Sequence, residues 1–166
     1  MVMQWSESLE LELEPMDETH KEFVEHYNAV ASAAPEDVLA RLDALIAHTV
    51  VHFDQENRWM EAISFPSCHR AEHDRVLQVM RDVRDRLEKG DGFFARQLIQ
   101  ELPAWFNNHA NTMDAALAFT LKSVGFDFER GAMPEGAVSA GCGCGTSEHV
   151  AKEAPAGSDA PVAAQA

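Results

Sequence analysis

Apolar residues recur at spacings of three and four along most of the chain, which is the period of an amphipathic α-helix. Proline and glycine interrupt this pattern at Pro35, Pro66, Gly90 and Gly125. The pattern therefore predicts four helices, at about residues 17–33, 36–63, 67–89 and 91–124. Ser67 is expected to cap the third helix, and Pro103 is expected to kink the fourth by removing one backbone hydrogen bond.

Short connections between long helices indicate an all-α fold, an antiparallel up-down-up-down four-helix bundle. Before the bundle, Trp5, Leu9 and Leu13 are spaced four apart in an acidic stretch that we expect to form an N-terminal arm. From about residue 129 the composition changes to Gly, Ala, Pro and Ser without an apolar period, so little burial can offset the entropy of ordering. We therefore expect one bundle domain at residues 1–128 and a disordered tail at residues 129–166.

Net charge and cysteine content indicate the cellular compartment of the protein and exclude some classes of binding partner. The formal net charge of -15 disfavours nucleic acid and anionic membrane surfaces, because both are polyanions. No stretch reaches the roughly 18 to 20 apolar residues of a membrane span, and the first residues lack the basic and apolar regions of a signal peptide. Three cysteines do not make a disulfide framework. The sequence thus predicts a cytoplasmic protein that binds a small molecule or a metal, and neither nucleic acid nor membrane.

Histidines and carboxylates fall in a regular pattern on the predicted helices. His52 and Glu56 are four residues apart on the second helix, and His69 and His73 are four apart on the third. Residues four apart share a helix face, so each pair can direct both side chains to one point. His20, near the start of the first helix, adds a candidate from another direction.

The fourth helix carries a less regular pair, His109 and Asp114, which are five residues apart. On an ideal helix this spacing separates two side chains by about 140°, which is wide for one face. A local π-bulge would bring the two together. Alternatively, Asp114 reaches the same point from the flank of the helix, and the spacing alone leaves both arrangements open.

The set contains five histidines and two carboxylates: His20, His52, Glu56, His69, His73, His109 and Asp114. A single buried histidine is more often a hydrogen-bonded core residue, but this many polar groups beside apolar stripes would be costly without a metal. Imidazole and carboxylate suit iron, zinc, copper or nickel, and seven ligands exceed the roughly four of a zinc site. Two metal ions bridged by the two carboxylates account for the whole set.

The segments MDETHKEF, HFDQE, FPSCHRAEH and WFNNHANTMD carry, in order, one His, His-x3-Glu, His-x3-His and His-x4-Asp. This pattern resembles the hemerythrin family, in particular its bacterial single-domain members, over about residues 3–126. The resemblance implies two iron ions joined by an oxo or hydroxo group. By position it assigns His69, His73 and His109 to one iron, His20 and His52 to the other, and Glu56 and Asp114 to the bridge.

The resemblance also implies reversible O2 binding at an open position of the second iron, for storage, delivery or sequestration and not for catalysis. The apolar lining of that position is expected to be Phe23, Phe53, Trp105 and Phe106. Two alternatives remain: a di-iron redox enzyme such as an oxidase, a peroxidase or a nitric oxide reductase, and a sensor of O2 or iron. An enzyme would benefit from a proton donor near the gas, and a sensor would need an output module; the sequence indicates neither. It does not indicate a protein that receives the O2.

Other positions depart from the family pattern or lie outside it. Ala110 stands where the family usually has a bulky aliphatic residue, and Leu117 where it usually has a tyrosine, which predicts a roomier and less polar pocket. Cys68 is expected to be a small interior or boundary residue. In the tail, Cys142 and Cys144 form a C-x-C motif, a weak signal for a soft metal or a redox pair.

Overall fold

The computed structural model describes residues 2–134 and 136. Four long stretches of these residues are helical, the last of them divided into three parts. The helices are α1 (Glu14–Ala31), α2 (Val38–Ala62), α3 (Ser67–Glu88), α4 (Phe93–His109) and α5 (Ala115–Ser123). Between α4 and α5 lies a π-helical segment, η2 (Ala110–Asp114), and a short 3-10 turn, η1 (Glu7–Leu9), precedes α1. The described residues contain one isolated β-bridge, between Asp127 and Ala132, and no strand.

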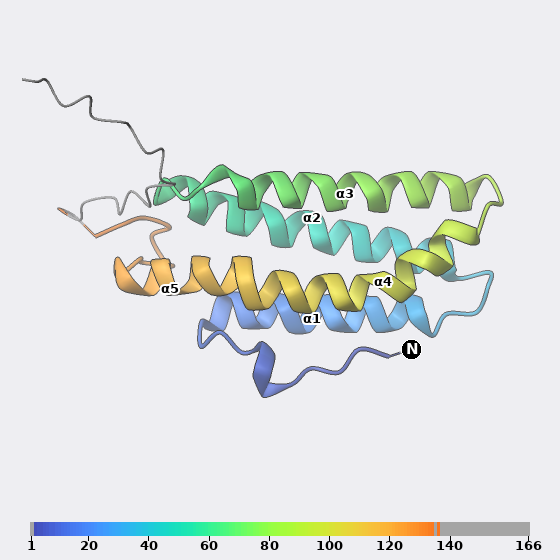
Figure 1. The fold of residues 1–166 in the computed structure, drawn as a ribbon, viewed down its shortest axis with the longest axis horizontal. Helices are drawn as coiled ribbons and strands as arrows, with labels where there is room; N and C mark the ends of the chain where they lie inside the picture. The colour runs from blue at the N-terminus through green and yellow to red at the C-terminus, as the bar shows by residue number, and fades with distance from the viewer. Residues whose placement is uncertain (1, 135, 137–166) are drawn as a thin grey trace, which may run out of the picture.

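The helices run alternately up and down along the long axis of the molecule, and α4, η2 and α5 form one continuous rod (Figure 1). Helix α1 contacts α2 and α4, and α3 contacts the same two helices from the other side. The predicted all-α, antiparallel four-helix bundle is therefore confirmed. No helix among the described residues is both long and apolar enough to cross a membrane.

Proline and glycine residues account for where two of the helices begin or end. Pro15 lies in the first turn of α1, where its missing N–H costs no hydrogen bond. Gly125 follows the last helix with a φ of 65°, a left-handed conformation that glycine adopts without strain. The prediction that Ser67 caps α3 is wrong: Ser67 is the first helical residue, Pro66 holds the cap position, and no side chain caps the end.

Pro103 lies inside α4 and leaves the carbonyl of Ile99, one turn earlier, without its usual helical donor. The Tyr27 hydroxyl on α1 donates a hydrogen bond of 2.6 Å to this carbonyl. Figure 1 shows the first turns of α4 set at an angle to the rest of the rod, as the predicted kink requires. A side chain from the neighbouring helix thus replaces the hydrogen bond that proline removes.

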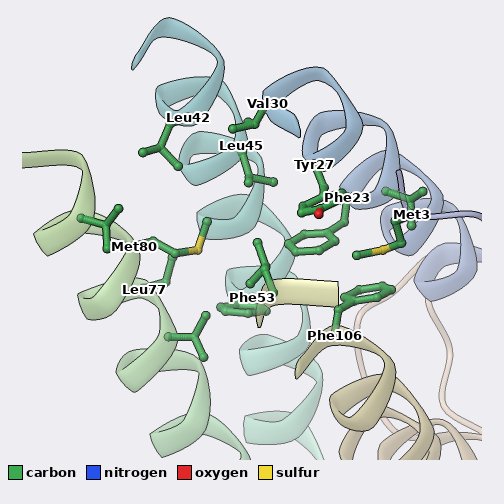
Figure 2. Packing of buried hydrophobic residues seen from close by; sticks show 14 of the residues in the cluster. Met3, Phe23, Tyr27, Val30, Leu42, Leu45, Phe53, Leu77, Met80 and Phe106 are labelled. Carbon is green, nitrogen blue, oxygen red and sulfur yellow. The ribbon is translucent and has the colours of Figure 1, made fainter. Parts of the chain in front are cut away.

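Buried apolar residues form two clusters, one towards each end of the bundle. The larger cluster packs between the four helices and includes Phe23 and Phe53 (Figure 2). Along α1, Met16 belongs to the smaller cluster and Phe23 to the larger one, with His20 between them. The predicted metal ligands thus occupy a polar layer between two apolar ones, where water has little access.

The N-terminal arm lies along α1 (Figure 1) and is held to it by hydrogen bonds. The Asn28 side chain accepts from the Met3 N–H and donates to the Met3 carbonyl, both at 2.8 Å. The Asp17 carboxylate accepts the N–H groups of Leu11 and Leu13. At the other end of the described chain, the residues after 128 form a turn. In this turn Asp127 and Ala132 exchange two backbone hydrogen bonds.

Candidate metal centre

The seven predicted ligands converge inside the bundle. Each long helical stretch supplies at least one of them: His20 comes from α1, His52 and Glu56 from α2, His69 and His73 from α3, His109 from the end of α4 and Asp114 from η2. All seven side chains are buried, and none is more than 3% exposed. Their ligand atoms form two groups that share Glu56 and that are close enough to hold metal ions.

The first group contains three histidines, together with Glu56 and Asp114. The Nε2 atom of His109 lies 3.2 Å from Nε2 of His69 and 3.1 Å from Nε2 of His73. An imidazole nitrogen has either one proton or one lone pair, so Nε2 of His109 cannot form a full hydrogen bond with both neighbours at once. Histidine nitrogens at right angles on a metal, with bonds of about 2.0 to 2.1 Å, lie about 3 Å apart. The spacing therefore fits coordination to one ion.

Glu56 lies between the two histidine groups. Its Oε1 atom is 2.9 Å from Nε2 of His52 and 3.9 Å from Nε2 of His20. Its Oε2 atom is 3.3 Å from Nε2 of His73 and 3.7 Å from Nε2 of His69. One carboxylate oxygen thus faces each group, which is the arrangement of a bridging ligand.

Asp114 repeats this arrangement from the opposite helix. Its Oδ2 atom is 3.1 Å from Nε2 of His20. Its Oδ1 atom is 3.0 Å from Nε2 of His69 and 3.1 Å from Nε2 of His109. Both carboxylates therefore divide their oxygens between the group of three histidines and the group of two, His20 and His52.

Several of these buried polar atoms have no hydrogen-bond partner among the described residues: Nε2 of His20, Oε2 of Glu56 and both carboxylate oxygens of Asp114. Burial would raise the pKa of Asp114, but the close imidazoles of His109, His20 and His69 hold it well below its usual range. Two ionised carboxylates are then enclosed together, which is costly unless cations compensate them. The residues present fit a metal centre.

The π-helical segment η2 decides how Asp114 reaches the centre. A π-helix has more residues per turn than an α-helix, so it brings residues five apart onto one face. Through this segment His109 and Asp114 both point inward, and Nε2 of His109 lies 3.1 Å from Oδ1 of Asp114. Of the two arrangements left open by the spacing, the structure has the π-bulge.

Two of the predicted lining residues lie against the group of two histidines. The rings of Phe23 and Phe106 stack with centroids 4.5 Å apart (Figure 2). The Phe106 ring meets the His20 ring edge-on at 5.4 Å, and Phe23 approaches His52 at 6.5 Å. These rings give that side of the centre an apolar wall.

The other two predicted lining residues pack on the group of three histidines. The Phe53 ring stacks on His73 with a centroid distance of 3.8 Å, and the Trp105 indole stacks on His109 at 4.8 Å. Phe53 and Trp105 also contact each other edge-on. The four aromatic residues singled out in the sequence therefore all lie at the centre. Phe53 lies beside both histidine groups, because its ring is also 5.4 Å from the His52 ring.

Two polar residues beside the centre were not predicted. Oδ1 of Asn57 is 3.2 Å from Nδ1 of His73, so it can accept the proton that this nitrogen carries when Nε2 binds a metal. Glu72 accepts a hydrogen bond of 2.8 Å from Nε1 of Trp105. Asn57 directly follows Glu56 and so could have been suspected. The contact of Glu72 crosses between helices and left no signal in the sequence.

Two further residues near the ligands, His48 and Cys68, do not belong to the centre. His48 is half-buried beside His52 and stacks on His26, and burial lowers its pKa to about 4, so it remains neutral. Cys68 was expected in the interior or at its boundary, but it is exposed, because it faces away from the bundle next to the inward-facing His69. The tail motif of Cys142 and Cys144 lies outside the described residues.

Comparisons with known proteins agree with this geometry. A family model described as the hemerythrin HHE cation binding domain matches residues 12–118. A bacteriohemerythrin of Ralstonia nicotianae is 48% identical over 128 residues, which cover 76% of this chain and 93% of that protein. A bacteriohemerythrin of Stenotrophomonas maltophilia is 26% identical over 72% of this chain and 81% of its own length. One of Methylococcus capsulatus is 26% identical over 59% of this chain and 79% of its own length. The family model matches most of the chain, and the buried histidines and carboxylates are residues that can bind cations. The chain therefore belongs to the hemerythrin family.

Proposed function

We propose that the seven buried residues hold two metal ions, with three histidines on one, two on the other and both carboxylates shared. The observation that carries this proposal is the division of each carboxylate, which turns one oxygen towards each histidine group. A single ion could bind only one of the two histidine groups and would leave the other group without a metal. Two cations also compensate the buried charge of Glu56 and Asp114.

We infer that both ions are iron and that the protein binds O2 reversibly. Imidazole and carboxylate are suitable iron ligands, and the similar proteins named bacteriohemerythrin support this choice over zinc. When bound, a pair of ferrous ions supplies electrons that O2 can accept and return. An ion held by His20 and His52 would have fewer histidine ligands than one held by His69, His73 and His109, and this would leave room for a small molecule there.

The surrounding side chains favour reversible binding over catalysis. The rings of Phe23 and Phe106 cover the side of His20 and His52 and keep water and anions away. Without water, a bound gas has no ready source of protons, so it leaves unchanged more readily than it reacts. We place this activity in the cytoplasm, in keeping with the small number of cysteines.

Metal analysis tests the two-ion part of the proposal. The purified full-length protein should contain about two irons per chain, as in other di-iron helical bundles. Glu56→Ala and Asp114→Ala should each lose most of the iron, because each removes a ligand from both ions. Asp54→Ala removes an exposed carboxylate from the same helix as Glu56 and should retain the iron. About one iron per chain, or zinc in its place, would contradict the proposal.

An optical experiment tests the O2 part and separates a carrier from an enzyme. The spectrum of the reduced protein is recorded under inert gas, after admission of air, and again after the O2 is removed. A carrier should return to its first spectrum over repeated cycles. A spectrum that does not return, with O2 consumed in proportion to an added reductant, would support the redox enzyme instead.

A further inference from the structure

Trp105 lies between the metal centre and a hollow at the molecular surface. The hollow, of about 120 Å³, opens between α3 and α4 and is lined by Val76, Val79, Leu98, Leu102, Trp105 and the charged Arg75 and Glu101. The same Trp105 indole stacks on His109, with ring centroids 4.8 Å apart. A small molecule in this hollow is therefore separated from a predicted iron ligand by one side chain.

The Trp105 indole is held in place from the neighbouring helix. Its Nε1–H donates a hydrogen bond of 2.8 Å to Oε1 of Glu72 on α3. Arg75, one turn further along α3, binds both oxygens of Glu72, at 2.8 Å from Nε and 2.6 Å from Nη2. The two hydrogen bonds from Arg75 thus fix the orientation of the carboxylate that accepts the indole N–H.

We propose that Glu72, oriented by Arg75, is a positioning residue that keeps Trp105 closed over the centre, and that the hollow outside is the entrance for a small uncharged gas. The part that concerns O2 rests on the function proposed above. Most of the lining is apolar and suits such a molecule, and the hollow is larger than the about 15 Å³ that a cavity needs to hold one molecule the size of water. A brief displacement of the indole would then connect the hollow to His109 and Phe53. The Phe53 ring also lies 5.4 Å from the His52 ring, so this route continues past Phe53 to the side of the centre where the gas is proposed to bind.

The alternative is that the Glu72 contact only adds stability to the fold. The two readings differ in what happens to the Trp105 indole when its acceptor is lost. A positioning role requires the indole to become more mobile and more accessible while the rest of the bundle stays intact. A purely structural role lowers the unfolding midpoint without a local change at Trp105.

Fluorescence quenching by acrylamide measures this accessibility directly. The experiment uses the full-length, iron-loaded chain with Trp5→Phe and Trp59→Phe, so that Trp105 is the only tryptophan left. Loss of one hydrogen bond should raise the population of the displaced indole about fivefold. We therefore expect Glu72→Ala to raise the quenching constant by up to that factor. Glu72→Gln retains an acceptor oxygen and should stay close to the parent, as should Asp74→Ala, which removes an exposed acid two residues away.

Two results would overturn the positioning role: an unchanged quenching constant in Glu72→Ala, or an equal rise in Glu72→Gln. Should Glu72→Ala not fold, Glu72→Leu takes its place, since it fills similar volume without an acceptor. The quenching experiment does not involve O2 binding, so it tests the positioning role of Glu72 independently of the proposed function.

The rate of irreversible oxidation in air tests the entrance. Glu72→Ala should accelerate this oxidation, and it should add nothing in a Trp105→Phe background, where no indole N–H remains to be held. The same acceleration in both backgrounds would show that Glu72 acts by another route. A protein whose spectrum does not cycle with O2 would refute the proposed function while leaving the quenching result valid.

Discussion

Asn57 contacts His73, one of the proposed metal ligands. Its side-chain oxygen lies 3.2 Å from Nδ1, on the side of the ring opposite to the converging Nε2 atoms. Such a contact fixes the tautomer and the orientation of a ligating imidazole. Asn57→Ala should therefore lower iron affinity by about 10- to 100-fold, measured by competition with a chelator. Asn111→Ala, which removes an exposed amide, is the matched control and should leave the affinity unchanged.

Tyr27 supplies the hydrogen bond that Pro103 cannot. Tyr27→Phe leaves the Ile99 carbonyl without this donor and should lower the free energy of unfolding by about 1 kcal/mol in urea titrations at equal iron loading. Pro103→Ala restores a backbone N–H one turn after Ile99. In that background Tyr27→Phe should cost less. An equal cost in both backgrounds would mean that Tyr27 contributes through packing and not through this hydrogen bond.

At the level of elements, η2 adjusts the turn of the helix to the spacing of the ligands. Deleting the exposed Thr112 would leave His109 and Asp114 four positions apart, a spacing that an ordinary α-helix places on one face. We therefore expect this deletion to convert the π-helix into α-helix and to retain most of the iron, as measured by metal analysis. Iron loss in this variant would show that the wider turn itself is needed to direct Asp114.

A second deletion serves as the control for that experiment. Ala116 is exposed and lies in α5, which has no π-segment to absorb a missing residue. Its removal should rotate the preceding or following residues by about 100° and take Leu117 or Asp114 out of its buried position. The Ala116 deletion should therefore be clearly less stable to heat than the Thr112 deletion.

At the scale of the whole molecule, residues just past the expected boundary at residue 128 make contacts with the residues before it. Met133 packs on the smaller apolar cluster, and Asp127 pairs with Ala132. Truncation after Pro134 should leave both stability and iron content unchanged. Truncation after Phe128 should keep the iron but lower the free energy of unfolding by about 1 kcal/mol, because it exposes apolar surface and breaks two hydrogen bonds. Iron loss in the shorter chain would contradict the view that the bundle alone suffices.

The four helices and the residues of the centre could be predicted because both depend on local geometry. A period of three to four apolar residues defines a helix and its buried face, whatever its neighbours are. Placing His52 with Glu56, and His69 with His73, requires only the turn of one helix. Gly90 and Gly125 similarly mark helix ends by their own conformational freedom.

What depended on contacts between distant segments could not be predicted in this way. Only the packed bundle decides that each carboxylate faces both histidine groups, that the fourth helix adopts a π-bulge, and that Glu72 holds Trp105 from a neighbouring helix. The folding back of residues 129–134 belongs to the same class. The sequence by itself determined which chemical groups each helix presents on its inner face, because helical periodicity is local. The tertiary structure decided which atoms meet, because that depends on how the helices pack against one another.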